Sequence, residues 1–416
     1  MKLDFFRQSR FVVWYACLLL AGISARAAEP PKSALAKAVE QAWHLNPLTA
    51  GLDAREIEVR AAQSVAAGLT PGPGSISIGS LNDRLNRNRG QQEYEAELAV
   101  PLWLPGQKAA HEAEAASRID EAAARRAALR LEISGELREA WWTLAAARSA
   151  RALAAQRLDT ARALETGVMR RYKAGELSRI DANLSRTETH AANAALVETE
   201  AMLLQAEQFV QAMTGAPAPL ELDEESPKTR HTAAETGDPA GFHPLLAAKA
   251  AAARSARAQL QVADESRRAA PELALRVVRE RSDFAEPYSN SVGIKLKIPF
   301  SSGAQVLRET SAAKAAAKQA DADVQRFQIR VRLDTERAQR NLQSAELQLA
   351  LAQERRQLSA ENLRLAEKAF LLGESDLASL LRIRAAAYDA DAFFDRQRVA
   401  RAAAISRLNQ ALGVLP

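Results

Sequence analysis

The stretch QEYEAELAVPL, residues 92–102, alternates apolar side chains with charged or small ones, and NSVGIKLKIPF, residues 290–300, repeats this pattern at an offset of 198. Because successive side chains of a strand point to opposite faces of a sheet, both stretches predict amphipathic β-strands. Other landmarks share the offset, which indicates that the chain is a tandem duplication. The matched pairs are Leu98 with Leu296, Val100 with Ile298, Pro101 with Pro299, Tyr172 with Phe370, Gly175 with Gly373, Glu176 with Glu374, and Gly215 with Gly413.

Two shorter alternating runs precede these strands and are related by an offset of 197, as is the start of a short helix before each run. We therefore expect one β-hairpin per repeat, with strands at about 74–82 and 91–102 in the first and about 271–280 and 290–300 in the second. The residues that carry this second offset are Asn46-Pro47-Leu48 with His243-Pro244-Leu245, and Ile76 and Ile78 with Leu273 and Leu275.

Two proline-free segments of more than a hundred residues, rich in Ala, Glu, Arg and Leu, follow the hairpins. Each predicts a very long helix, at about 106–172 and 304–370, and such a helix spans about 100 Å. A glycine ends each one, and a return helix is expected at about 179–214 and 377–412. Apolar residues at helical or seven-residue spacing predict packing as coiled coils. They are Leu129, Ile133, Leu137, Trp141 and Leu144, and the heptad Leu351, Leu358, Leu365 and Leu372.

The first 27 residues combine basic residues, an apolar run at 11–23 and the small-residue motif Ala25-Arg26-Ala27, which predicts a cleaved secretory signal. Ile23 stands where a lipid anchor would require cysteine, so we expect no lipidation, and the only cysteine, Cys17, leaves with the signal. The remaining chain divides into a first repeat at 28–216, a proline-rich acidic linker at 217–241 and a second repeat at 242–416.

Strands of about 9–11 residues fit a tilted crossing of a lipid bilayer. Four strands are too few to close a barrel, so closure would require several copies of the chain. The fold class expected is mainly α with a small transmembrane β part, whose charged face lines a lumen. Trp103 and Phe300 suit an aromatic girdle at the membrane surface. The alternatives are a soluble amphipathic hairpin and, for Trp103, a core position. The lumen charges are Glu93, Glu95, Glu97, Lys295 and Lys297.

Composition and motifs argue against several function classes. Without the signal, the formal net charge falls from +5 to +2, which removes the electrostatic argument for nucleic-acid binding. No histidine stands with another histidine or a cysteine at metal-ligand spacing, so no metal or other cofactor is expected. The chain has no phosphate-binding loop, nucleophile elbow or catalytic triad, and we do not expect an enzyme.

The signal, the duplicated helix-hairpin-long-helix units, the prolines that end the strands and the pattern Arg-Tyr-x-x-Gly-x-x-x-x-x-Asp at residues 171–181 together resemble the TolC family of outer-membrane efflux ducts. Chain length, Asn46-Pro47 and Gly72-Pro73 look most like its CzcC-type heavy-metal branch. The resemblance implies a homotrimer with a 12-stranded outer-membrane barrel on a periplasmic α-helical barrel. It also implies a periplasmic adaptor (membrane fusion) protein and an inner-membrane pump of the RND type as partners.

By this resemblance the chain passively conducts substrate, with heavy-metal cations as one cargo, from the pump through the periplasm and outer membrane. A duct for protein secretion and a soluble periplasmic coiled-coil adaptor or scaffold remain the alternatives. We expect the helix-turn-helix tips to dock the adaptor and a second group, Tyr172, Asp181 and Arg382, to gate the mouth. Repeat two has Ser379 where repeat one has Asp181. The tip residues are Gly175, Glu176, Leu177, Ser178, Gly373, Glu374, Ser375 and Asp376.

Overall fold

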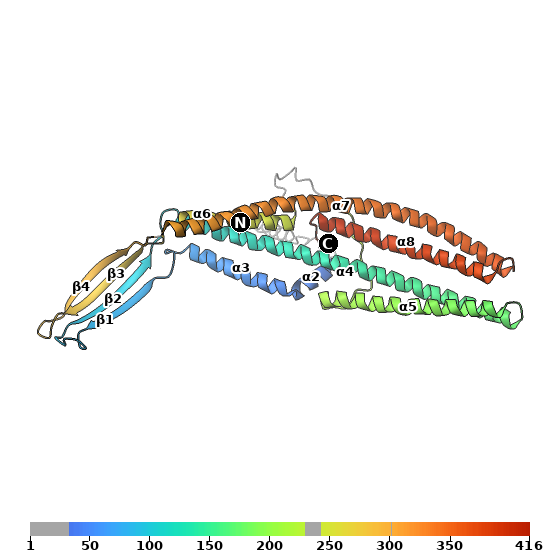
Figure 1. Cartoon of the computed structure of the whole chain (residues 1–416), viewed down its shortest axis with the longest axis horizontal. Coiled ribbons are helices and arrows are strands. Elements are labelled where there is room, and N and C mark those ends of the chain that lie inside the picture. The colour runs from blue at the N-terminus through green and yellow to red at the C-terminus, as the bar shows by residue number, and fades with distance from the viewer. Residues whose placement is uncertain (1–32, 229–242, 301) are drawn as a thin grey trace, which may run out of the picture.

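The computed structural model describes residues 33–228, 243–300 and 302–416 of an elongated molecule (Figure 1). A small sheet lies at one end, two helix-turn-helix tips lie at the other, and two long helices run between them. The expected signal at 1–27 and the part of the linker from 229 to 241 lie outside the described residues. Within the described ranges, no helix is both long and apolar enough to cross a membrane.

Apart from one additional helix, α2, the elements follow the expected order, and the fold class is confirmed as mainly helical with a small antiparallel sheet. The first repeat contains α2 (Ala34–Leu45), α3 (Pro47–Ala66), β1 (Ser75–Asn82), β2 (Gln92–Pro101), α4 (Gln107–Lys173) and α5 (Arg179–Thr214). The second contains α6 (Pro244–Glu265), β3 (Glu272–Arg281), β4 (Ser289–Lys297), α7 (Gly303–Leu371) and α8 (Leu377–Ala411).

The last strand of each repeat is shorter than the sequence predicts. The strand expected to reach Leu102 ends at Pro101, and the strand expected to reach Phe300 ends at Lys297. Proline has no N–H to donate to a neighbouring strand, and accordingly Pro101 is the last residue of β2 and β4 ends two residues before Pro299.

The same local signals begin and end helices in both repeats. Pro47 and Pro244 occupy the first positions of α3 and α6, where a backbone N–H would have no acceptor within the helix. Asn46 caps α3 through a side-chain oxygen that accepts a backbone N–H at 2.9 Å. Gly215 and Gly413 follow α5 and α8 with φ of 70° and 78°, a conformation that glycine adopts without strain.

The four strands form one antiparallel sheet in the order β1-β2-β3-β4, so the hairpins of the two repeats join through β2 and β3. Leu98 lies opposite Leu275, and Glu97 lies opposite Arg276. Directly opposed residues share a face, and the register therefore collects the apolar residues on one side, here called the apolar face. Its members are Ile76, Ile78, Tyr94, Ala96, Leu98, Val100, Leu273, Leu275, Val277, Val292, Ile294 and Leu296.

The helices form a layer with the long helices α4 and α7 as its frame. On one side α4 contacts α3 and α5, and on the other it contacts α6 and α8, which in turn contact α7. The shorter helices therefore lie end to end, α3 with α5 and α6 with α8, beside the long ones (Figure 1). This arrangement leaves α7 on one edge of the layer and α3 and α5 on the other.

The core lies midway along the molecule, around two neighbouring tryptophans of α4. Trp141 is fully buried and Trp142 nearly so, packed with residues of α2 and α8. Trp142 Nε1 donates a hydrogen bond to Ser406 Oγ at 2.8 Å. The predicted apolar spacing on α4 is confirmed, because Ile133, Leu137 and Leu144 are buried and Leu129 packs against the same region.

The leucine heptad on α7 does not make the coiled-coil contact that we expect for it. Leu351, Leu358, Leu365 and Leu372 are all more than half exposed. The buried residues of α7 are mostly small, because α6 and α8 approach it closely and leave no room for leucine side chains. They are Ala317, Val331, Thr335, Ala338, Ala345, Ala352, Ala366 and Phe370.

Candidate functional site

Ion pairs cover the polar face of the sheet. The Arg276 guanidinium on β3 donates to Glu95 at 2.9 Å and to Glu93 at 3.3 Å, both on β2. Lys295 Nζ reaches across β3 to Glu97 at 3.2 Å, over the small side chain of Ala274. The structure therefore brings the five predicted lumen charges onto one face.

Two further charges that form ion pairs on this face, Glu272 and Arg276, were missed by the sequence reasoning. Lys297 pairs with Glu272 at 3.2 Å, and Arg276 is the centre of the pairs described above. The alternation on β3 could have found both residues, because Glu272 and Arg276 occupy the positions between the apolar Leu273, Leu275 and Val277.

Nothing in the described part of the chain covers the apolar face of the sheet. Ile78 is 85% exposed and Ile294 is 80% exposed, and the other large residues of this face are also well exposed. A sheet that packs within its own chain buries its apolar face. This sheet instead presents that face outward, and it pairs its charges on the opposite side.

The two edges of the sheet are unpaired as well. β1 and β4 each have a partner on one side only, so the outer backbone groups of both strands have no strand neighbour within the described residues. Every residue of β1 and of β4 is exposed. Open edges of this length are places where another strand can add.

At the far end of the molecule, the tips are tight turns built as the sequence predicts. Gly175 and Gly373 have φ of 82° and 78°, and a Cβ added at either would meet no other atom within 4 Å. Ser178 begins α5 and Asp376 begins α8, each accepting a backbone N–H from three residues on. Glu176, Ser178, Glu374 and Asp376 are exposed, whereas Leu177 and Ser375 are half-buried.

The two tips of one chain pack together. Val168 near the end of α4 lies in one apolar cluster with Phe370, Leu377 and Leu380 of the second repeat. Arg171 strengthens the junction: it donates to Phe370 O at 3.5 Å, lies 5.2 Å from the Phe370 ring centroid and pairs with Glu176 at 3.1 Å. A partner that touches one tip therefore also meets the other.

The predicted gate residues do not meet within one chain. Asp181 forms a capping box with Ser178, whose N–H and Oγ both donate to the carboxylate, at 3.0 and 2.7 Å. Arg382 donates instead to Ser379 Oγ at 3.0 Å. The Asp181–Arg382 pair is absent from the described ion pairs, because each side chain bonds to a serine in the first turn of its own helix. Tyr172 is exposed and lies in the last turn of α4, just before Gly175. A pair between Asp181 of one copy and Arg382 of another stays a prediction.

The cap of α8 depends on a carboxylate. Asp376 accepts the N–H of Ser379 at 2.6 Å, and this bond, together with the Ser379 hydroxyl and the charge of Arg382, holds the pKa of the carboxyl below its ordinary value. A carboxylate with a lowered pKa stabilises the fold at pH above its unfolded pKa, about 4, and loses that contribution as pH falls through the lower folded pKa.

We therefore expect the second tip to loosen in acid. The backbone amides of Ser379 and Leu380, which both donate to Asp376, should keep their hydrogen-exchange protection from pH 7 down to about pH 4 and lose it below. Asp376→Ser is the matched control, since a serine hydroxyl can accept the same backbone N–H, as Ser178 does at the start of α5, and does not itself titrate. Protection in that variant should not change between pH 7 and pH 3, and an equal acid loss in both proteins would contradict the assignment.

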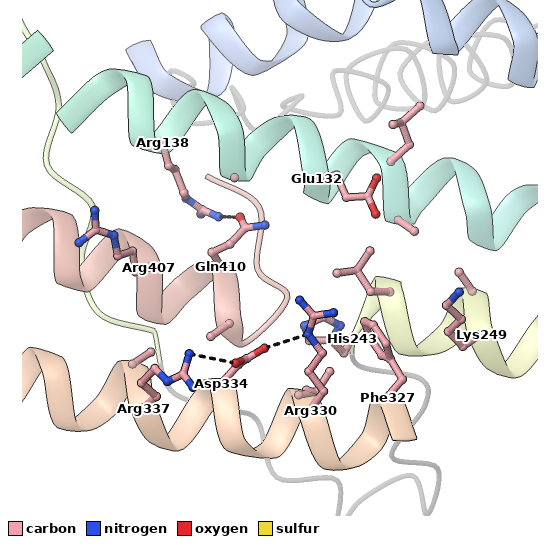
Figure 2. Close-up of a pocket in the computed structure, with 18 of the residues that line it drawn as sticks. Glu132, Arg138, His243, Lys249, Phe327, Arg330, Asp334, Arg337, Arg407 and Gln410 are labelled. Atoms are coloured by element: carbon pink, nitrogen blue, oxygen red, sulfur yellow. Dashed lines mark hydrogen bonds and ion pairs between the residues drawn. The ribbon is translucent and has the colours of Figure 1, made fainter. Parts of the chain in front are cut away.

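A cavity of about 820 Å³ lies where α6 and α8 meet between the long helices. Figure 2 shows Asp334 between Arg330 and Arg337, at 3.5 and 3.9 Å, and Arg138 bonded to Gln410. The sequence gives no sign of this cavity, because its walls come from four separate helices.

The aromatic residues expected at the membrane surface differ from each other. Phe300 is almost fully exposed beyond the end of β4. Trp103 is half-buried; its Nε1 donates to Gly68 O at 3.1 Å, and its ring lies 5.4 Å from that of His111. Trp103 therefore joins the end of α3 to the start of α4, and its place at a membrane surface stays a prediction.

Within the described ranges, no group of three or more His, Cys, Asp or Glu side chains could hold a metal ion.

Comparison with known proteins places this architecture among solved membrane-channel structures. Comparisons with family models and with curated proteins give no match. Among solved structures, the outer membrane protein VceC from Vibrio cholerae has a TM-score of 0.74 and 15% identity, over 91% of this chain and 96% of that chain. The CmeC outer membrane channel of Campylobacter jejuni has a TM-score of 0.72 and 15% identity, over 91% and 85%. The open-state MtrE outer membrane channel of Neisseria gonorrhoeae has a TM-score of 0.73 and 16% identity, over 91% and 89%. The chain has the fold of these outer-membrane channel proteins.

Proposed function

We propose that the chain is the outer-membrane channel of a tripartite efflux system and belongs to the TolC family. The observation that carries this proposal is the four-stranded sheet, which exposes an apolar face, pairs its charges on the other face and leaves both edges open. The fold shared with VceC, CmeC and MtrE supports it.

The open edges and apolar face of the sheet by themselves favour a closed barrel formed by several copies of the chain. In lipid no water is present to satisfy an open strand edge, so every edge must find a strand partner. Joining β4 of one copy to β1 of the next achieves this, and three copies give twelve strands, an even number within the range of known barrels. The apolar face then contacts lipid, and the charges around Arg276 line a wet pore.

The helical layer has matching apolar edges. The α7 edge carries a stripe of exposed leucines, among them Leu351, Leu358 and Leu365. The opposite edge, made by α3 and α5, carries its own set of exposed apolar residues: Ile57, Val65, Ile180, Val197, Leu204 and Phe209. In a ring of three copies the two edges meet, which gives the leucine heptad its coiled-coil partner in a neighbouring chain.

The partners follow from the position of the tips. A channel in the outer membrane takes its substrate from an inner-membrane pump, which we propose to be of the RND type, and the exposed turns around Gly175 and Gly373 are the surface for a periplasmic adaptor. Their helix ends offer free backbone N–H groups and few large side chains, so an adaptor hairpin can approach closely. Heavy-metal cations are the cargo that the sequence resemblance favours.

The location of the chain tests this proposal directly. The protein should fractionate with the outer membrane, run in detergent as a trimer that heat dissociates, and form ion-conducting pores in a planar bilayer. A soluble periplasmic adaptor or scaffold would instead be released by osmotic shock, and this result would overturn the channel proposal.

The docking surface is tested at its glycines. Gly373→Trp and Gly175→Trp should each abolish efflux, because a large side chain blocks the approach of the adaptor, while the trimer reaches the outer membrane in normal yield. Asparagine tolerates positive φ, so Gly373→Asn is the control that keeps the turn without the bulk and should retain efflux. Efflux is read as the resistance of cells that carry the cognate pump. Normal pumping by the tryptophan variants would place the docking surface elsewhere.

A further inference from the structure

The apolar face of the sheet changes character toward the hairpin end, away from the helices. On β3 the residues of this face run Leu273, Leu275, Val277, Arg279 and Arg281, because alternate residues share a face. Leu273 and Arg279 are about 20 Å apart along the strand at about 3.4 Å per residue. Barrel strands tilt by about 35–45°, so Arg281, two residues farther on, stands about 20 Å from Leu273 along the membrane normal. The lipid-facing band of a membrane barrel is about 25 Å tall, so the two arginines lie toward its hairpin-side rim.

Aromatic rings mark the same level. Tyr94 lies directly opposite Arg279, and its ring is 6.4 Å from that of Tyr288, which immediately precedes β4. Tyrosine in such a row is typical of the boundary between lipid tails and headgroups. From the helices outward, the face therefore passes from aliphatic side chains to a zone in which aromatic and cationic side chains lie together.

The two guanidinium groups are held in place. Arg279 lies 4.7 Å and Arg281 4.9 Å from the ring centroid of Tyr288, and Arg281 is also 5.4 Å from that of Phe284. Arg281 Nε donates to Gly90 O at 3.0 Å, which ties it to the loop of the first hairpin. Both cations thus sit over one ring with their remaining N–H groups free for another acceptor.

No carboxylate neutralises these arginines. Neither Arg279 nor Arg281 takes part in any ion pair among the described residues, whereas Arg276 on the polar face is paired with two glutamates. Two acids of the hairpin loops are engaged with backbone: Asp83 accepts the N–H groups of Arg89 and Gly90, and Asp283 accepts those of Ala285 and Glu286. Among the described residues the two arginines therefore have no counter-charge, and their N–H donors are open to an anion from outside the chain.

We propose that Arg279 and Arg281 form a binding site for the phosphate of a lipid headgroup in the leaflet that surrounds the hairpin ends. This inference rests on the proposed membrane barrel. A guanidinium group binds phosphate through two parallel N–H donors, and arginine at a membrane rim extends toward the headgroups. The site is continuous with Val277 and Leu275, so a ligand with phosphate above acyl chains contacts the whole of it, while free phosphate contacts only its end.

The test compares lipids that differ only in phosphate. Purified trimer in neutral detergent is mixed with diphosphorylated lipid A, or with phosphatidic acid against diacylglycerol of the same chains, and bound lipid is counted by native mass spectrometry. The wild-type trimer should prefer the phosphorylated lipid by about tenfold, and Arg279→Gln combined with Arg281→Gln should remove this preference. The control, Lys295→Gln with Lys297→Gln, removes the same charge from the polar face of the sheet and should keep it.

The outcomes separate this inference from the channel proposal. A double arginine variant that still forms conducting trimers but has lost the phosphate preference supports the site. An unchanged preference in that variant, or no preference in the wild-type trimer, overturns it. Equal competition by inorganic phosphate overturns the lipid assignment, because the site would then bind a free anion. Failure of the wild-type chain to insert into a membrane overturns the channel proposal, and this inference with it.

Discussion

Leu296→Arg should prevent the chain from assembling in the outer membrane. Leu296 lies on the apolar face of β4, opposite Leu273, and is 56% exposed in the single chain. In a barrel this exposure is toward lipid, where an arginine costs up to about 2–4 kcal/mol per copy, most at the midplane and less toward the rim. Three symmetric copies bear the cost together. The measurement is the yield of heat-dissociable trimer in the outer-membrane fraction.

The neighbouring residue supplies the control. Lys295 lies on the polar face and pairs with Glu97 across the sheet, so Lys295→Glu changes a charge in the wet lumen. That variant should assemble normally and alter the conductance of the pore in a planar bilayer. The duplication predicts the same contrast in the first repeat, between Leu98→Arg and Glu97→Lys. Equal tolerance at the two faces would refute the strand orientation.

Glu225→Ala should destabilise the middle of the molecule by about 3–5 kcal/mol, which is typical when one partner of a buried ion pair is removed. Arg138 on α4 is 1% exposed, and its guanidinium donates two bonds to Glu225, at 2.7 and 3.0 Å. Without Glu225 the buried charge keeps only neutral acceptors, Gln410 Oε1 and Val414 O.

Chemical denaturation in detergent, followed by the helical circular-dichroism signal, measures this loss. Glu224→Ala is the matched control, because Glu224 is exposed, adjacent, of the same charge and without an ion pair among the described residues. It should unfold at the denaturant concentration of the wild-type protein. A shared midpoint for both variants would mean that Glu225 does not hold Arg138.

Most of the fold could be predicted from local patterns in the sequence. Alternation placed the strands because each strand has one apolar and one charged face, and prolines and glycines placed the ends of the helices. The separate helix α2 was not anticipated, although Asn46-Pro47 marks the point where it gives way to α3. Each of these features is decided by residues close together in the chain.

Features decided over long distances were not predictable. Arg138 gathers Glu225, Gln410 and Val414, which belong to the linker, to α8 and to the C-terminal tail, and no spacing in the sequence connects them. The leucine heptad of α7 correctly predicts an apolar stripe on that helix, but the spacing does not indicate which other helix packs against the stripe. The capping box of Asp181 was visible as an acid three residues after Ser178, and it takes precedence over a pair with distant Arg382.

The joining of β2 to β3 also sets the order in which the molecule can be built. Pro101 lies opposite Glu272, and the whole of α4, α5 and α6 separates them in the chain. Closing so long a loop is slow, because the chain must lose conformational entropy before the β2–β3 pairing stabilises it. The first hairpin is therefore synthesised well before its partner and exposes an apolar face and two bare edges until β3 follows. Exposed apolar surface and unpaired strand edges promote aggregation, so a chain truncated after the first repeat should aggregate.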